Sequence, residues 1–167
     1  MQDYPRGQME LLRQLELMEA RFHELGRDPE LDALIDEAKA HFDVGTAAIT
    51  LLTRDEQLVR TGGGRDILHT PREVAFCNYT ILDDKVFVVR DTRRDPRFRD
   101  NPATTSPPFV RFYAGAPLTY LEGLRLGAFC LFDNVPREFF PGEQAELTDF
   151  AERAVDILIS RLDLRRR

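Results

Sequence analysis

Residues 111–133 read RFYAGAPLTYLEGLRLGAFCLFD and predict two strands joined by a short polar turn. The second strand, Leu124–Phe132, is apolar on both of its faces, and a strand of that kind lies at the centre of a sheet that is covered on both sides. Pro117 lacks the amide hydrogen that a central ladder needs, so the first strand is expected to stop there or to lie at an edge. The turn is expected at Thr119–Gly123, since Glu122-Gly123 combines polarity with a residue that tolerates positive φ.

A second apolar run, Val44–Thr53, also has hydrophobic residues on both faces and predicts another central strand. Gln57–Thr61 is more polar and is expected near an edge, and Lys85–Arg90 predicts a further short strand. If the two apolar runs lie side by side, their side chains are almost completely removed from water. We therefore expect near-complete burial at four positions on adjacent strands, which are Ile49, Leu126, Ala128 and Cys130.

The first predicted helix, Gln8–Leu25, contains no glycine or proline and is rich in Glu, Leu, Gln and Arg. Its apolar residues are spaced by four and three, which is the period of about 3.5 residues that a coiled-coil seam has. The members of this seam are Leu11, Leu15, Met18, Phe22 and Leu25. Two interpretations stay open, because the seam can pack on its own domain or against a second copy of the chain.

Three later helices have recognisable starts. Asp28–Phe42 begins with an aspartate cap and has Pro29 at its first helical position. Thr70–Asp84 has the same arrangement with threonine as the cap, and Pro141–Leu164 forms the last helix. The apolar face of this last helix consists of Leu147, Phe150, Ala154, Ile157 and Leu158. Helices at both ends of a set of mostly antiparallel strands predict an α+β fold.

The composition argues against several classes of partner. The formal net charge is -6 and the pI is about 5.1, which disfavours binding to nucleic acid or to an anionic membrane surface. No apolar run approaches the roughly 20 residues that a bilayer-spanning helix needs, and no signal peptide is recognised. We therefore expect a cytoplasmic protein with no nucleic-acid partner and no membrane partner.

Residues with catalytic or metal-binding chemistry are few and scattered. His23, His41 and His69 lack the spacing of metal ligands, so no metal site is expected. Cys77 and Cys130 stand in apolar surroundings without a neighbouring lysine or histidine that would lower a thiol pKa. They are interpreted as small buried hydrophobic residues, with redox activity of either thiol as the less favoured alternative.

Five segments carry a resemblance to a known family. In chain order they are AFCNYTI (75–81), VFVVRDTRRDPRF (86–98), RFYAGAPL (111–118), GLRLGAFCLFD (123–133) and PREFF (136–140). Their order and spacing resemble those of GAF domains in bacterial sensor kinases and cyclases. The resemblance covers roughly residues 31–162 and implies a bacterial signalling domain.

The resemblance implies a GAF-like (profilin- or PAS-like) fold, with a central antiparallel sheet of five or six strands and the terminal helices on one face. A helix and loops on the other face would close a small-molecule pocket. Carried onto this sequence, the candidate pocket residues are Phe76, Cys77, Tyr79, Asp91, Arg111 and Tyr113. Asp91 is interpreted first as the cap of a turn at Thr92–Asp95, and Arg111 as its ion-pair partner or a clamp for an anionic ligand. Phe76 and Tyr113 are interpreted first as core residues, with contact to a ligand as the alternative.

Residues 1–27 are interpreted as a dimerisation helix and residues 28–167 as the GAF domain. The resemblance implies a sensory module and no enzyme, with an unidentified small-molecule ligand, an undefined cofactor, a homodimer and a separate signalling output protein. The last helix is expected to add a second row to the dimer, formed by Leu147, Phe150, Ala154, Ile157 and Arg161. Two alternatives stay open: a dimerisation or scaffold domain without a pocket, and a thiol-based redox sensor or an enzyme similar to free methionine-R-sulfoxide reductases.

Overall fold

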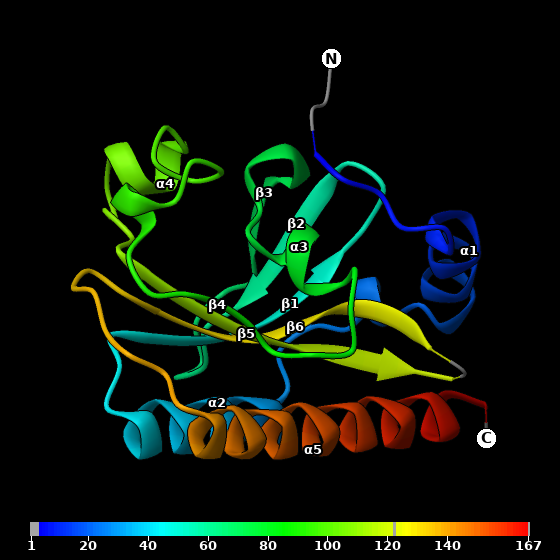
Figure 1. The fold of residues 1–167 in the computed structure, drawn as a ribbon. Coiled ribbons are helices and arrows are strands. Elements are labelled where there is room, and N and C mark those ends of the chain that lie inside the picture. Colours follow the sequence, from blue (N-terminus) through cyan, green and yellow to red (C-terminus); the bar gives the residue numbers. More distant parts are fainter. Residues whose placement is uncertain (1–3, 122, 167) are drawn as a thin grey trace.

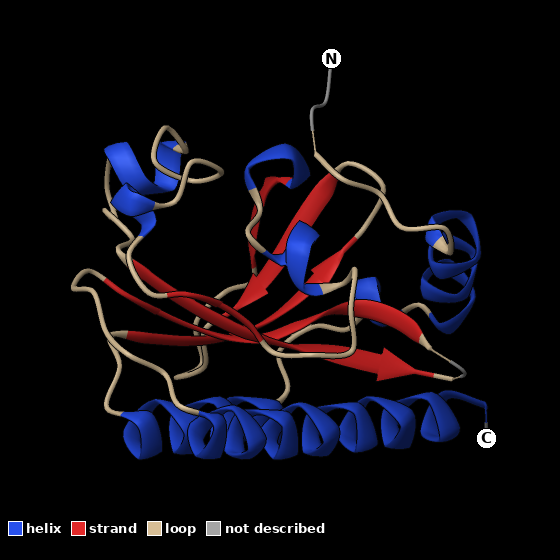
Figure 2. Cartoon of the chain, viewed as in Figure 1, coloured by secondary structure: helices blue, strands red, loops and turns tan. Residues whose placement is uncertain are grey.

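The computed structural model describes residues 4–121 and 123–166 of the 167-residue chain. A six-stranded antiparallel sheet with the strand order β3-β2-β1-β6-β5-β4 forms its centre (Figures 1 and 2). The strands are β1 (Thr46–Leu52), β2 (Glu56–Arg60), β3 (Leu68–Pro71), β4 (Phe87–Val89), β5 (Phe112–Tyr120) and β6 (Leu124–Asp133). The predicted α+β fold with an antiparallel sheet of five or six strands is confirmed.

Helices cover the two faces of the sheet unequally. The long helices α2 (Pro29–Phe42) and α5 (Pro141–Arg166) lie side by side on one face (Figure 1). The other face carries short elements, which are η2 (Arg72–Val74), α3 (Cys77–Thr80), η3 (Thr92–Arg94) and α4 (Pro102–Thr105). The first helix, α1 (Glu10–Ala20), lies at the end of the sheet and not on the face of α2 and α5. There Arg13 donates hydrogen bonds to the carbonyls of Leu52 in β1 and Leu126 in β6.

The two runs that are apolar on both faces form neighbouring central strands, as predicted. The register between β1 and β6 sets Ile49 opposite Phe129 and Ala48 opposite Cys130. The four positions expected to be buried, Ile49, Leu126, Ala128 and Cys130, are 0 to 1% exposed. Both faces of these strands are covered, by α2 and α5 on one side and by the short elements on the other, so each face needs apolar side chains.

Strand β5 continues through Pro117 instead of stopping there. The pairing of β4 with β5 reaches only to Gly115. Beyond that point β5 is itself an edge strand, as the alternative prediction had it, and an edge tolerates a residue without an amide hydrogen. The predicted turn includes Glu122, which lies outside the described residues. Its neighbours Leu121 and Gly123 have φ angles of 50° and 80°.

Two predicted helices differ from the structure. The helix expected over residues 8–25 ends at Ala20, because Arg21 adopts a left-handed φ of 59° and a 3-10 turn, η1 (Phe22–Glu24), follows. The helix expected from Thr70 is replaced by the edge strand β3, the 3-10 turn η2 and the single turn α3. Thr70 pairs with Gln57 of β2, so it is extended, and Pro71 is tolerated at the sheet edge.

The predicted boundary between residues 27 and 28 does not interrupt the core. Leu17, Ala20 and Phe22 belong to the same apolar cluster as the buried residues of α2 and α5. Buried Arg60 of β2 donates to the carbonyl of Gly26 at 2.7 Å and holds the connection between η1 and α2. Residues 10–26 therefore pack as part of the same unit.

Helix α2 begins as predicted, with Asp28 accepting hydrogen bonds from the amides of Glu30 and Leu31. Asp28 also pairs with Arg161 of α5, and these hydrogen bonds lower the pKa of the Asp28 carboxyl. The row of α5 residues expected at a dimer interface packs inside the domain instead. Its members Leu147, Phe150 and Ala154 are buried in the α2–α5 cluster, and Ile157 packs against it.

Candidate functional site

The sheet face opposite α2 and α5 is hollow over one half. A groove of about 600 Å³ is bounded by strands β2 and β3 and by the segment 103–110 that includes part of α4. We call it the β2 groove. Its apolar walls include Val59, Val74, Ala75, Phe76, Val110 and Phe132, and its polar walls Thr46, Gln57, Thr61, Thr70 and Asp133. Pockets of about 300–1,000 Å³ with mostly apolar walls and a few polar groups are typical of small-molecule sites.

Two side chains give the β2 groove its polarity. Gln57 of β2 is only 9% exposed. Its Nε2 donates to the Thr70 hydroxyl at 3.2 Å, whereas its Oε1 has no hydrogen-bond partner among the described residues. Asp133 at the end of β6 accepts hydrogen bonds from the backbone amides of Gly45 and Asn134. Within the described part of the chain, no arginine, lysine or histidine lines this groove.

The other half of the same face is filled by aromatic rings. This aromatic cluster consists of Phe76, Tyr79, Phe87, Phe98 and Tyr113. The ring centroid of Phe98 lies 4.4 Å from that of Phe76 and 5.2 Å from that of Tyr79. Phe98 is 2% exposed and Tyr113 is 0% exposed. Side chains of the chain itself therefore occupy this half of the face.

The six predicted pocket residues are divided between these regions. Of the six, only Phe76 lines the β2 groove. Tyr79 and Tyr113 belong to the aromatic cluster together with Phe76, and Cys77 is buried beside Tyr113. Asp91 and Arg111 lie apart from the groove and bind each other. The structure thus brings four of the six side chains together, and their contact with a ligand stays a prediction.

Asp91 and Arg111 form a two-pronged ion pair, with both nitrogen–oxygen distances at 3.1 Å. Asp91 also accepts a hydrogen bond from the amide of Arg93 and so caps η3, as predicted. The Arg111 guanidinium lowers the pKa of the Asp91 carboxyl, and the Arg93 amide adds to this effect. Because the carboxylate occupies the guanidinium fork, the pair fastens η3 to the start of β5.

The two cysteines are buried side chains, as predicted, but they lie next to each other. Both are free thiols and 0% exposed. Cys77 Sγ lies 3.1 Å from the Thr50 hydroxyl and 3.3 Å from the Tyr113 hydroxyl. Burial raises the pKa of Cys130, and its hydrogen bond with Cys77 raises it further. For Cys77, burial favours the neutral thiol, but hydrogen bonds from Cys130, Thr50 and Tyr113 outweigh it and lower the pKa.

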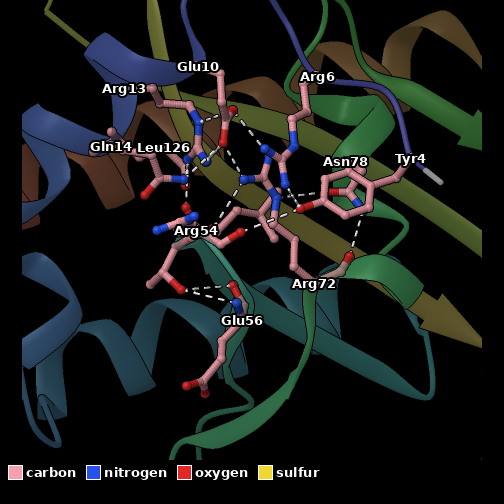
Figure 3. A network of polar contacts seen from close by, with 12 residues as sticks. Tyr4, Arg6, Glu10, Arg13, Gln14, Arg54, Glu56, Arg72, Asn78 and Leu126 are labelled. Carbon is pink, nitrogen blue, oxygen red and sulfur yellow. Dashed lines mark hydrogen bonds and ion pairs between the residues drawn. The ribbon is translucent and has the colours of Figure 1, made fainter. Parts of the chain in front are cut away.

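A buried arginine in η2 pairs with a carboxylate of the first helix, as Figure 3 shows. Arg72 of η2 is 0% exposed, and its guanidinium donates to both carboxylate oxygens of Glu10 in α1. It also donates to the Thr53 carbonyl and, through Nε, to Asn78 Oδ1, each at 3.1 Å. Arg13 of α1 donates to the same Glu10 carboxylate at 3.1 Å. The polar groups of this arginine network, defined by Arg72, Glu10, Arg13 and Asn78, satisfy one another.

The arginine network shifts the titration of its carboxylate. Burial of Glu10 favours the protonated form, but hydrogen bonds from Arg72 and Arg13 outweigh burial and hold the Glu10 pKa well below its ordinary value of 4.5. The Tyr4 ring covers the Arg72 guanidinium at 5.0 Å from the ring centroid. Since η2 leads directly into the groove wall at 74–76, the pair of buried Arg72 and half-buried Glu10 joins this wall to α1.

The outer face of α1 is apolar and exposed. Helix α1 contacts its own domain through Arg13, Leu17 and Ala20, which are all buried. Five side chains in or just before the helix stay 44 to 74% exposed, and these are Met9, Leu11, Leu12, Leu15 and Met18. Three of the five predicted seam residues therefore face away from the domain, whereas Phe22 is buried in it.

Sequence reasoning missed Gln57, Thr70 and Arg72 as members of the site. A signal for Gln57 exists, because it shares a strand face with apolar Val59, where a polar residue needs a partner. Arg72 gives no such signal, since Thr70-Pro71-Arg72-Glu73 has the pattern of a helix start and an exposed arginine fits that pattern.

Two further kinds of feature are absent from the described residues. No helix there is long and apolar enough to cross a bilayer. Within the same residues, no group of three or more His, Cys, Asp or Glu side chains is placed to hold a metal ion.

Comparison with known proteins shows similarity to a cyclic di-GMP phosphodiesterase and to solved GAF domains. No family model matches it. A cyclic di-GMP phosphodiesterase of Pseudomonas aeruginosa is 45% identical over 114 residues, which are 68% of this chain and 19% of that relative. The chain thus spans about a fifth of the length of this relative.

Solved structures show the same fold at low sequence identity. The GAF domain of an Acinetobacter phosphoenolpyruvate-protein phosphotransferase matches with a TM-score of 0.63 and 13% identity, over 97% of this chain and 100% of that one. A type II free methionine-R-sulfoxide reductase from Thermoplasma acidophilum matches with a TM-score of 0.53 and 13% identity, over 76% of this chain and 95% of that one.

Proposed function

This chain has the GAF fold, and we propose that it is a sensory domain that binds a small molecule in the β2 groove and acts in signal transduction. The observation that carries the proposal is the groove, which offers about 600 Å³ of mostly apolar space. Its floor includes a buried amide oxygen without a hydrogen-bond partner among the described residues. An apolar ligand that packs against these walls removes both apolar surfaces from water, which favours binding.

The arginine network supports a route from the groove to α1. The groove wall at 74–76 follows η2 directly, and Arg72 of η2 binds Glu10 of α1. A ligand that shifts this wall must either move α1 with it or leave the buried Arg72 guanidinium without its carboxylate partner, which is costly. On this proposal α1 reports the binding state of the groove to a partner.

A thermal-shift screen tests ligand binding in the groove. The full chain is melted with a panel of nucleotides, amino acids, polyamines and aromatic heterocycles. A ligand at 100 times its Kd adds about 2.7 kcal/mol, which for a chain of this size raises Tm by roughly 5–10 °C. Val59→Trp fills the groove and abolishes the shift, whereas Val135→Trp, on an exposed loop, preserves it. A panel that shifts nothing, or a shift that survives Val59→Trp, would contradict the proposal.

The exposed face of α1 favours a homodimer as the form in which the domain signals. Leu11, Leu15 and Met18 are 74, 54 and 65% exposed and recur at the spacing of a coiled-coil seam. Contiguous exposed apolar side chains mark interaction surfaces, and a second copy offers a self-complementary partner around a two-fold axis. The α5 row is buried, so the proposed interface consists of α1 residues.

Sedimentation equilibrium at tens of micromolar tests the homodimer. The double variant Leu15→Glu/Met18→Glu is expected to be a folded monomer, because like charges meet across the axis. The matched variant Val135→Glu/Phe140→Glu changes two equally exposed apolar residues outside α1 and keeps the dimer. A wild-type chain that is monomeric under these conditions contradicts the homodimer.

The similarity to a cyclic di-GMP phosphodiesterase supports an output in cyclic di-GMP signalling. We propose a regulatory role there and no hydrolytic one, because the chain has the fold of GAF domains and aligns with only 19% of that relative. Incubating the purified chain with cyclic di-GMP and measuring its hydrolysis tests this assignment. The nucleotide is expected to stay intact, and hydrolysis by the chain alone would overturn the regulatory role.

A further inference from the structure

The β2 groove is unsuited to anionic ligands. Asp133 is the one ionisable side chain among the described residues that line it, and it is half-buried. Its carboxylate uses one oxygen for the Gly45 amide at 3.2 Å and the other for the Asn134 amide at 2.8 Å. A carboxylate or phosphate on the ligand would be repelled by Asp133 with no lining cation to offset the repulsion. An N–H group of the ligand would find further acceptor capacity on the same carboxylate.

The groove floor calls for a hydrogen-bond donor. Gln57 is only 9% exposed, and its amide nitrogen already donates a hydrogen bond to the Thr70 hydroxyl. Its Oε1 lacks a donor among the described residues. Gln57 lines the groove and the terminal torsion of a glutamine is broad, so rotation about this torsion can present the oxygen to a ligand. A buried acceptor left unpaired is costly, and a ligand N–H or O–H group removes that cost.

The walls select a flat apolar body. Phe76 and Phe132 both line the groove, with ring centroids 6.2 Å apart and planes at 59°. Val59 and Val110 complete the apolar surface. Tilted aromatic walls of this kind pack well against the faces and edges of an aromatic ring.

We infer that the β2 groove takes a flat aromatic ligand that carries an N–H or O–H donor and no negative charge, such as a neutral heterocycle or an aromatic amine. The inference rests on the proposed function and specifies the ligand class of the same groove. It leaves cyclic di-GMP outside that class, because its phosphates would meet Asp133 and no lining cation.

Four matched probes test the inference by amide chemical-shift titration of the isotope-labelled full chain. Indole is neutral with an N–H donor, 1-methylindole lacks the donor, tryptamine is cationic and indole-3-acetate is anionic. Indole and tryptamine are expected to shift amides at 57–61 and 68–70. Loss of one hydrogen bond makes 1-methylindole about fivefold weaker than indole. Repulsion by Asp133 makes indole-3-acetate about tenfold weaker than tryptamine.

Two variants assign these differences to their side chains. Gln57→Met keeps the volume and removes the acceptor, so indole and 1-methylindole bind equally. Asp133→Asn keeps a hydrogen-bond acceptor for a backbone amide but removes the negative charge. The difference in affinity between tryptamine and indole-3-acetate should therefore become smaller. Gln8→Met changes an exposed glutamine outside the groove and alters neither comparison.

The outcomes separate the ligand class from the proposed function. If indole-3-acetate or added cyclic di-GMP binds in the groove more tightly than indole, the ligand class is wrong and the groove remains a binding site. If 1-methylindole binds as well as indole, the role of Gln57 is wrong. If none of these probes shifts the groove amides at millimolar concentration, the ligand class is overturned, whereas the proposed binding function is decided by the thermal-shift screen with its Val59→Trp control.

Discussion

The two halves of the sheet face opposite α2 and α5 belong to the same sheet but differ in how tightly side chains pack on them. Over β4 and β5, five aromatic rings pack with centroids as close as 4.4 Å. The thiols of Cys77 and Cys130 are fully buried in the same cluster. Over β2 and β3, smaller side chains such as Val59, Thr61 and Thr70 line a groove of about 600 Å³. Short helices and loops lie over both halves of this sheet face. The size of the side chains therefore decides which half is packed core and which half is an open groove.

The largest loss of stability is expected when a ring of the aromatic cluster is removed. Phe98→Ala removes a ring that is 2% exposed and contacts three other rings of the aromatic cluster. The resulting cavity should cost about 3–5 kcal/mol of unfolding free energy, measured by urea denaturation. Phe140→Ala truncates a ring that is 62% exposed and should change stability by about 0.5 kcal/mol or less. Equal losses in the two variants would mean that the cluster is not core.

An intermediate effect is expected where the groove wall is tied to α1. Glu10→Gln replaces the carboxylate that Arg72 and Arg13 share, and it should cost about 1.5–3 kcal/mol at about pH 7. The Glu10 pKa is lowered in the folded chain, so its contribution is complete above the ordinary value of 4.5 and is lost as pH falls below it. The stability gap between wild type and variant should therefore narrow toward about pH 3.

Glu19→Gln is the matched control for this titration, because Glu19 is exposed on the same helix. Its stability should parallel that of the wild type at every pH. A gap between Glu10→Gln and wild type that stays constant from neutral to acid pH would show that the ionised carboxylate is not what holds α1.

A smaller effect is expected in the hollow half. Val59→Ala removes two methyl groups from a side chain that faces an open groove and not the packed core, so it should cost about 1 kcal/mol or less. The same substitution should weaken indole binding by enlarging the groove. A destabilisation comparable with that of Phe98→Ala would mean that the groove is closed and packed in solution.

The smallest response is expected when the two thiols of the folded chain are treated with an alkylating reagent. Cys77 and Cys130 are 0% exposed, so iodoacetamide should label neither at neutral pH until denaturant is added. The lowered pKa of Cys77 increases its thiolate fraction but does not give the reagent access. Mass spectrometry of the native chain measures the labelling. Rapid modification of Cys77 in the folded state would favour the thiol-based alternative.

Strongly patterned elements were predictable from the sequence. Val44–Thr53 and Leu124–Phe132 are short apolar runs with hydrophobic residues on both faces, a pattern typical of doubly covered strands, and they are β1 and β6. The cap at Asp28 and the pairing of Asp91 with Arg111 were also predictable, because short-range chemistry determines the first and the second was one of two alternatives for Arg111.

Features that depend on long-range packing were not predictable. The buried face of α1 includes Arg13, whose charge is satisfied by Glu10 and two strand carbonyls that no local pattern reveals. Edge strand β3 is four residues long and ends in a proline, so its sequence favours a turn or a helix start. The groove is the space left over when all elements have packed, and Gln57 was therefore counted as an ordinary edge-strand residue.

Hydrogen exchange of the full chain with and without indole tests the central claim most directly. The claim is that the hollow half receives the ligand and that the arginine network passes the change to α1. Indole at saturating concentration should slow exchange at residues 56–71 and alter exchange at residues 10–20, while residues 112–116 beside the aromatic cluster stay unchanged. Slower exchange confined to residues 87–116, or an unchanged α1 when residues 56–71 are protected, would contradict the account.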